Sequence, residues 1–160
     1  MKVPDRVDLK ILRELQANAR LSIAELAGRV SLTATPCARR VQQLENAGFI
    51  DQYATLLNQA AIGLPVNAFV EVRLTRERQE EIAEFETAVR SYREVIECWA
   101  MSGGYDYLLR VTSPDLESYN KFLRTKLLRL SCVDHVETNF ALERVLYSTA
   151  LPLDHLETTN

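Results

Sequence analysis

The spacing of the apolar residues changes once along this chain, near Gly63 and Pro65. Before that point, apolar side chains recur every three or four residues, which is typical of amphipathic helices. After it, stretches with an apolar residue at every second position alternate with further helical stretches, which indicates strands and helices in one fold. The sequence therefore predicts two domains, a mainly helical one over residues 1–60 and a mixed one over residues 61–160.

The composition is that of a soluble cytoplasmic protein. The 160 residues are 47% apolar and 26% charged, so two small domains can each bury a core. The sequence has no apolar run of about 18 residues, as a membrane span requires, and its charged N-terminus does not resemble a secretory signal. Cys37, Cys98 and Cys132 are odd in number and far apart, which favours free thiols in a reducing cytosol.

Three short helices are expected within residues 1–60. Asp5 can cap the first, whose apolar residues recur at helical spacing. Ser22 and Glu25 have the spacing of a capping box and start the second. The link to the third helix is only Ser31 and Leu32, so the second and third helices form a helix-turn-helix.

The third helix has one apolar side and one polar side. Thr33 is placed to cap it, Pro36 falls in its first turn, and Gly48 ends it. Cys37, Val41 and Leu44 form the apolar stripe. The opposite side holds Thr35, Arg39, Gln42, Gln43 and Asn46. The strand-like stretch 49–57 (FIDQYATLL) then stands where a winged helix has its wing.

The charge distribution favours DNA as a partner. The net charge is −3, yet residues 1–60 carry +2 and residues 61–160 carry −5. Arg and Gln side chains read guanine and adenine edges, and the N-terminus of a helix suits phosphate. The expected DNA-binding residues are Thr33, Thr35, Arg39, Arg40, Gln42 and Gln43. The alternative is that this polar side is an ordinary solvated helix face.

Residues 61–160 predict strands and helices in the order βαββαβ. Strands are expected over residues 66–74, 95–101, 105–111 and 136–142, with helices after the first and third. Ser113 and Pro114 are placed to open the second of these helices. This order is the ferredoxin-like pattern, with both helices on one face of an antiparallel sheet. The expected fold class is therefore α+β, and the uncovered sheet face favours dimerisation.

Several motifs together resemble the Lrp/AsnC family of bacterial and archaeal transcription regulators over nearly the whole chain. The first domain contributes Ala19-Arg20-Leu21-Ser22 and Thr33-Ala34-Thr35-Pro36-Cys37-x-Arg39-Arg40-Val41. The second contributes Gly103-x-Tyr105-Asp106-Tyr107-Leu108-Leu109 and the closing Ser148-Thr149-Ala150-Leu151-Pro152-Leu153. The resemblance implies an N-terminal winged helix-turn-helix and a C-terminal effector-binding and oligomerisation domain, called RAM in this family.

The resemblance also implies a homodimer that assembles further into an octamer, with an amino-acid effector at the contact between dimers. Carried onto this chain, the effector-binding residues are Ser102, Gly103, Gly104, Tyr105, Asp106 and Thr138. Adjacent backbone N–H groups at the two glycines can hold a carboxylate, and Asp106 can pair with an ammonium group. The alternative is that the glycines only make a tight strand connection, which Asp106 caps.

Enzymatic function is not expected. His135 and His155 have no further ligands at metal-binding spacing, and the sequence shows neither a catalytic triad nor a phosphate-binding loop. No cofactor and no membrane partner are expected. The predicted function is a DNA-binding transcription regulator that responds to an amino-acid effector. Two alternatives stay open: an architectural DNA-binding protein that ignores effectors, and a ligand-binding regulatory module of an enzyme.

Overall fold

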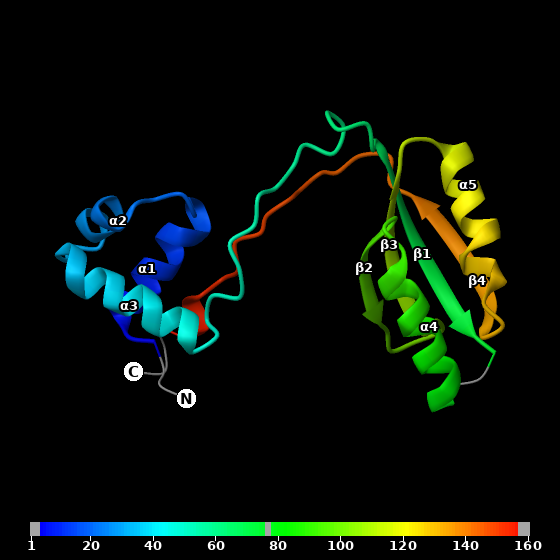
Figure 1. Cartoon of the computed structure of the whole chain (residues 1–160), viewed down its shortest axis with the longest axis horizontal. Helices are drawn as coiled ribbons and strands as arrows, with labels where there is room; N and C mark the ends of the chain where they lie inside the picture. Colours follow the sequence, from blue (N-terminus) through cyan, green and yellow to red (C-terminus); the bar gives the residue numbers. More distant parts are fainter. Residues whose placement is uncertain (1–3, 76–77, 157–160) are drawn as a thin grey trace. The chain divides into compact units, whose positions relative to one another are not determined.

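The computed structural model describes residues 4–75 and 78–156, and the chain divides into two compact units (Figure 1). Unit 1 contains the residues up to Leu56 together with the C-terminal segment from Val145, and unit 2 runs from Leu57 to Arg144. The first boundary lies close to the expected one near residue 60. The C-terminal segment differs from expectation, because it groups with unit 1 and not with residues 61–144.

Unit 1 is built from three helices, α1 (Arg6–Ala17), α2 (Ile23–Arg29) and α3 (Ala34–Asn46). Capping boxes start the first two, with Asp5 and Asp8 at α1 and Ser22 and Glu25 at α2. In each box the cap side chain accepts a backbone N–H that has no partner within the helix. The expected cap and capping box are thus confirmed. The unit's core consists of Leu9, Ile11, Leu12, Leu15, Leu26, Ala27, Val30, Cys37, Val41 and Leu44.

Tight turns end α2 and α3 in the same way. After α2 the N–H of Leu32 donates to the C=O of Ala27 at 2.9 Å, and Ser31 between them has a φ of 58°. After α3 the corresponding place is taken by Gly48, with a φ of 75°. A left-handed residue at this point turns the chain sharply out of the helix. The expected two-residue link and the glycine stop are both confirmed.

The C-terminal segment is fastened to α1. Gln16 exchanges two hydrogen bonds with the backbone of Leu151: its Nε2 donates to the C=O at 3.2 Å, and its Oε1 accepts the N–H at 2.6 Å. Leu153 and Leu156 pack against the core of unit 1, the latter in a short 3-10 turn, η2 (Asp154–Leu156). These contacts explain why the end of the chain belongs to unit 1.

The expected wing strand is not formed in this chain. Residues 49–57 are described throughout and contain no strand. A strand requires a hydrogen-bonded neighbour, and Tyr53, Leu56 and Leu57 are exposed. The Tyr53 hydroxyl donates to Glu45 of α3 at 2.9 Å, which ties the middle of the segment to the helix.

Unit 2 is a four-stranded antiparallel sheet with the predicted βαββαβ order. Its elements are β1 (Val66–Leu74), α4 (Gln79–Ser91), β2 (Val95–Ala100), β3 (Tyr107–Ser113), α5 (Leu116–Thr125), the 3-10 turn η1 (Leu127–Arg129) and β4 (Val133–Phe140). The strand order is β2-β3-β1-β4. The α+β fold class is therefore confirmed. Three details differ. β3 spans Tyr107–Ser113 and not residues 105–111, and β4 spans Val133–Phe140 and not residues 136–142. Because Ser113 still belongs to β3, α5 is capped by Asp115, whose side chain accepts the Ser118 N–H at 2.6 Å.

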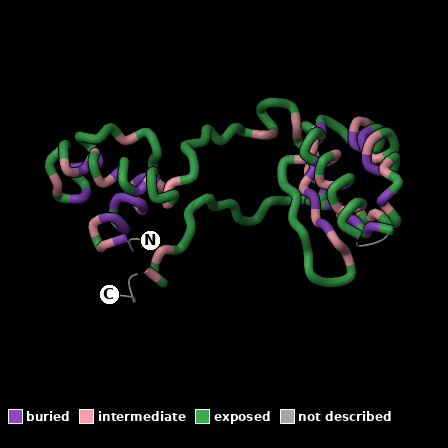
Figure 2. The backbone as a smooth tube through the Cα atoms, turned by 60° about the horizontal axis from the view of Figure 1, so that its bottom comes forward, coloured by how far each residue is buried: buried purple, intermediate pink, exposed green. Residues whose placement is uncertain are grey.

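Both helices cover the same face of the sheet. The core joins alternate residues of the strands, such as Val70 and Leu109, to Phe85 of α4 and Phe122 of α5. Figure 2 shows the resulting alternation of buried and less buried positions in unit 2. The intervening positions face away from the helices and include the exposed residues Phe69 and Trp99. The face without helices is mixed rather than apolar, since Arg110 lies on it beside Glu97 at 2.8 Å.

Candidate nucleic-acid interface and effector loop

The outward side of α3 carries polar side chains, as the sequence predicts. Cys37, Val41 and Leu44 are buried toward α1 and α2, which fixes the rotation of the helix. The side chains left exposed are Thr33, Thr35, Arg39, Gln42 and Gln43. Thr33 is the N-cap residue, but its side chain makes no capping hydrogen bond. Its hydroxyl thus stays available beside the positive end of the helix dipole, where phosphate binds well.

Arg40 differs from the other predicted DNA-binding residues. Its Nη1 donates to Asp5 Oδ2 and to Asp8 Oδ1, each at 2.7 Å. Its side chain is 28% exposed and that of Asp8 only 12%. Burial tends to raise the pKa of Asp5, but hydrogen bonds from the Asp8 amide and Arg40, with the Arg40 charge, lower it overall. Arg40 therefore ties α3 to the N-terminus of α1.

Residues 29–44 contain three arginines, Arg29, Arg39 and Arg40, and no acidic residue. Arg29 forms an ion pair with Glu14 of α1 at 2.9 Å, and Arg40 is held as described. Within residues 4–75 and 78–156, Arg39 has no ion-pair partner, and it is exposed on the outer side of α3. A free guanidinium in this position can donate two parallel hydrogen bonds to a guanine edge or to a phosphate.

The predicted effector loop connects β2 to β3. It is closed by a hydrogen bond from the Met101 N–H to the Asp106 C=O at 2.8 Å. Ser102, Gly103 and Gly104 are exposed, and Gly103 has a φ of 147°, which a residue with a side chain rarely adopts. The loop therefore presents two adjacent glycines with their backbone open to a ligand.

Asp106 forms a hydrogen bond to β1 that could not be predicted from the sequence. Its Oδ2 accepts the backbone N–H of Leu74 at 2.7 Å, at the point where the pairing of β1 with β4 shifts register. Its own N–H donates to the C=O of Val72 at 2.9 Å. This contact differs from the alternative interpretation, in which Asp106 caps the strand connection, because the carboxylate binds the end of β1. The second carboxylate oxygen has no hydrogen bond among the described residues and remains able to accept one from a ligand.

Thr138 lies apart from the loop within one chain. It pairs with Val70 of β1, four positions from Leu74, which corresponds to about 13 Å along an extended strand. Its Oγ1 is 2.6 Å from the Tyr119 hydroxyl of α5. The loop and Thr138 therefore do not form one site in a single subunit.

Tyr105 is held above the sheet at the end of the loop. Its hydroxyl donates to Glu137 at 2.5 Å, and its ring stacks on that of His135 with 6.2 Å between centroids. The hydrogen bond to the Glu137 carboxylate raises the pKa of Tyr105. Tyr105 thereby joins the loop to β4 from the side opposite the helices.

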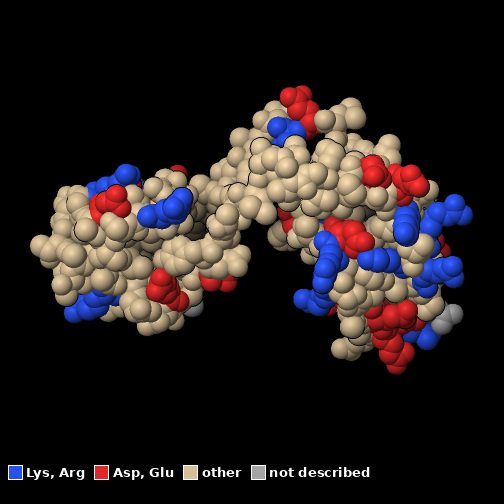
Figure 3. All heavy atoms as spheres, turned by 45° about the horizontal axis from the view of Figure 1, so that its top comes forward, with Lys and Arg blue, Asp and Glu red and all other residues tan. Residues whose placement is uncertain are grey.

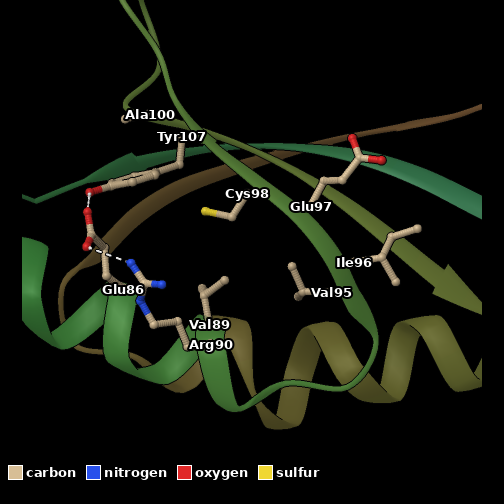
Figure 4. A pocket seen from close by; sticks show the side chains of 9 residues that line it. All are labelled: Glu86, Val89, Arg90, Val95, Ile96, Glu97, Cys98, Ala100 and Tyr107. Atoms are coloured by element: carbon tan, nitrogen blue, oxygen red, sulfur yellow. Dashed lines mark hydrogen bonds and ion pairs between the residues drawn. The ribbon is translucent and has the colours of Figure 1, made fainter. Parts of the chain in front are cut away.

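A cavity of about 220 Å³ lies between α4 and β2. Nothing in the sequence points to it beyond the alternation that puts Cys98 and Tyr107 on one face. Figure 4 shows Glu86 between Tyr107 and Arg90, which also line the cavity. It accepts the Tyr107 hydroxyl at 3.0 Å and pairs with Arg90 at 3.7 Å. These polar groups satisfy one another, so the cavity is not part of the candidate site.

Metal ligands do not gather in the described part of the chain, which holds no cluster of three or more His, Cys, Asp or Glu side chains that could bind an ion. Among the helices of residues 4–75 and 78–156, none is long and apolar enough to span a membrane.

Family models match both halves of the chain. A model of the Lrp/AsnC ligand binding domain matches residues 67–151, and a model of winged helix-turn-helix DNA-binding domains matches residues 4–51. The leucine-responsive regulatory protein of Escherichia coli (strain K12) is 42% identical over 147 residues, which cover 92% of this chain and 90% of that protein.

Two solved structures share the architecture. A transcriptional regulator of Neisseria meningitidis in complex with L-Met has a TM-score of 0.92 and 39% identity, covering 95% of this chain and 98% of its own. An AsnC family transcriptional regulator from Agrobacterium tumefaciens has a TM-score of 0.89 and 39% identity, covering 94% of this chain and 98% of its own.

Proposed function

This chain belongs to the Lrp/AsnC family of transcriptional regulators, and from that premise we propose that it binds double-stranded DNA through α3 under the control of a small amino acid. The observation that carries this proposal is Arg39, which is exposed and has no ion-pair partner in the described part of the chain, on a helix side that lacks acidic residues. A recognition helix in the major groove needs such a side. Thr35, Gln42 and Gln43 lie on it as well, and Thr33 lies at its N-terminal end.

Arg40 is assigned a different part in DNA binding. Because both Asp5 and Asp8 hold its guanidinium at 2.7 Å, it orients α3 and leaves base contact to Arg39. An orienting residue of this kind affects DNA affinity through the stability of unit 1. We therefore assign Arg40 to the support of the recognition helix.

The β2–β3 loop is the proposed effector site. The exposed N–H groups near Gly103 and Gly104 suit a carboxylate, and the free oxygen of Asp106 suits an ammonium group. The related Neisseria regulator was solved in complex with L-Met, which supports an amino acid as the ligand class. Since Thr138 lies away from the loop, we propose that it completes the site from a neighbouring subunit.

Assembly into homodimers and then an octamer is proposed on the basis of uncovered apolar side chains. Phe69 and Trp99 are exposed on the open sheet face. Residues 53–57 and 142–151 contain further exposed apolar side chains, namely Tyr53, Leu56, Leu57, Leu142, Val145, Leu146 and Leu151. Burial of such surface against a second copy stabilises an oligomer.

The proposed mechanism is a shift between assembly states. An effector that binds one assembly better than another favours it by the difference in affinity, and the spacing of the paired α3 helices changes with it. We propose that the protein acts in the cytoplasm, where its DNA ligand is found, and that its role is regulation and not catalysis.

A ligand screen tests the effector half of this proposal. The free amino acids are tested singly for a rise in melting temperature, and light scattering measures the size of the protein with each one that raises it. Asp106→Asn keeps an oxygen for the Leu74 N–H but removes the charge, so we expect a normal fold and no response to the effector. A response in this variant equal to that of the wild type would exclude Asp106 from ligand binding.

A further inference from the structure

The second unit is acidic overall, yet it carries one basic stretch. Residues 118–133 contain Lys121, Arg124, Lys126 and Arg129 and no acidic residue. They cover most of α5 and all of η1. α5 itself has one acidic residue, Glu117 in its first turn, whereas α4 carries four glutamates and one arginine. Figure 3 shows that Lys and Arg side chains gather on this unit beside acidic ones.

One of these four basic residues, Lys126, forms its contacts within unit 2. The Nζ of Lys126 lies 2.7 Å from Glu94 and 5.4 Å from the centre of the Tyr92 ring. Lys121, Arg124 and Arg129 are exposed, and no residue in the described ranges forms an ion pair with any of the three. These three residues are called the α5 basic surface below.

The helix dipole accounts for only one member of this surface. Cations stabilise the last turn of a helix, and Arg124 lies in the last turn of α5. Lys121 lies in the middle of the helix, and Arg129 lies beyond its end, in η1. Lys121 and Arg124 are three residues apart and therefore project from neighbouring positions on the same side.

We propose that the α5 basic surface binds the phosphate backbone of DNA outside the segment that α3 reads. This inference rests on the proposed function, because it concerns the same duplex. Lys and Arg side chains without protein partners neutralise phosphates and release counterions, and this contribution is independent of base sequence. Unit 2 would thus add affinity for flanking DNA, and unit 1 would select the site.

A charge-neutral variant of the surface tests this inference on two duplexes. One duplex is limited to a site selected in vitro with the wild-type protein, and the other extends that site at both ends. For Lys121→Ala, Arg124→Ala and Arg129→Ala combined, we expect unchanged binding to the short duplex and about tenfold weaker binding to the long one. The slope of log K against log salt concentration on the long duplex should decrease by about 0.9 for each phosphate that the variant no longer neutralises.

A second triple variant, Arg73→Ala, Arg78→Ala and Arg90→Ala, removes the same charge from unit 2 and serves as the matched control. It should bind both duplexes like the wild type. Equal salt slopes for the α5 variant and the wild type on the long duplex would overturn the inference, as would an equal reduction in affinity for the control. Failure of the proposed function is distinguishable, because the wild type would then bind neither duplex with sequence preference.

Discussion

The guanidinium of Arg40 in α3 lies 2.7 Å from the carboxylate of Asp8 in α1. The same nitrogen is 2.7 Å from Asp5, the N-cap residue of that helix. One arginine thus joins the recognition helix to the capping box that starts the chain's first helix. Its neighbour Arg39 makes no such contact in the described part of the chain, so two adjacent arginines have separate roles.

Removal of Arg40 should destabilise unit 1. Arg40→Met leaves the largely buried Asp8 carboxylate without its charged hydrogen bond, so we expect the free energy of unfolding of unit 1 to fall by about 2 kcal/mol. Arg39→Met is the matched control and should change it by less than about 0.5 kcal/mol. Amide hydrogen exchange of α1 and α3 measures both. Equal protection in the two variants would contradict the structural role of Arg40.

Unit 2 should lose stability in alkaline solution because of Tyr107. Burial and the hydrogen bond to Glu86 raise the pKa of Tyr107 to about 12, from an ordinary value of 10.0. Since the folded pKa is above the unfolded one, this contribution is complete below about pH 10 and is lost as the pH rises to about 12. Denaturation of unit 2, followed by Trp99 fluorescence at increasing pH, measures this loss. We expect the stability of Tyr107→Phe to decline less steeply with pH than that of the wild type. The same slope in both proteins would exclude Tyr107 as the cause.

Ser31 is a residue with a side chain in a left-handed turn, with a φ of 58°. Glycine adopts this conformation without strain but has more freedom in the unfolded chain. We expect Ser31→Gly to stabilise unit 1 by about 0.5 kcal/mol and Ser31→Val to destabilise it by about 1–2 kcal/mol. Protection of the α2 and α3 amides in hydrogen exchange measures these changes. If Ser31→Val were more stable than Ser31→Gly, the turn would have to adopt a different backbone conformation in the variants.

The C-terminal segment should stabilise the DNA-binding unit and not the sheet. Leu153→Ala removes a partly buried side chain from the core of unit 1, so we expect that unit to be less stable by about 1 kcal/mol. Gln16→Ala should act in the same direction, because it removes both hydrogen bonds to Leu151. Trp99 fluorescence, which reports on unit 2, should give unchanged unfolding. A shift in that transition would contradict the grouping of this segment with unit 1.

Local signals in the sequence predicted most of the fold. The Ser22–Glu25 box, Pro36 in the first turn of α3 and Gly48 at its end each act within a few residues of chain, and the structure has them as expected. The alternation in unit 2 likewise depends only on neighbouring positions. Its two helices therefore lie on the expected face.

Contacts between distant residues could not be predicted in this way. Arg40 lies 35 residues from Asp5, and Gln16 lies 135 residues from Leu151, so no spacing rule connects them. Residues 49–57 look like a strand, but a strand forms only where a partner pairs with it. The sequence placed Asp106 in the loop, yet only the structure shows its hydrogen bond to Leu74.

The most direct test of DNA recognition by α3 is the affinity of Arg39→Ala for a duplex selected in vitro with the wild-type protein. We expect binding weaker by about 1–3 kcal/mol, with unit 1 as stable as in the wild type. Arg39→Lys should recover phosphate affinity but not base preference, and Arg90→Ala, the charge-matched control in unit 2, should bind normally. An Arg39→Ala isotherm identical to that of the wild type would contradict the assignment of α3 as the recognition helix.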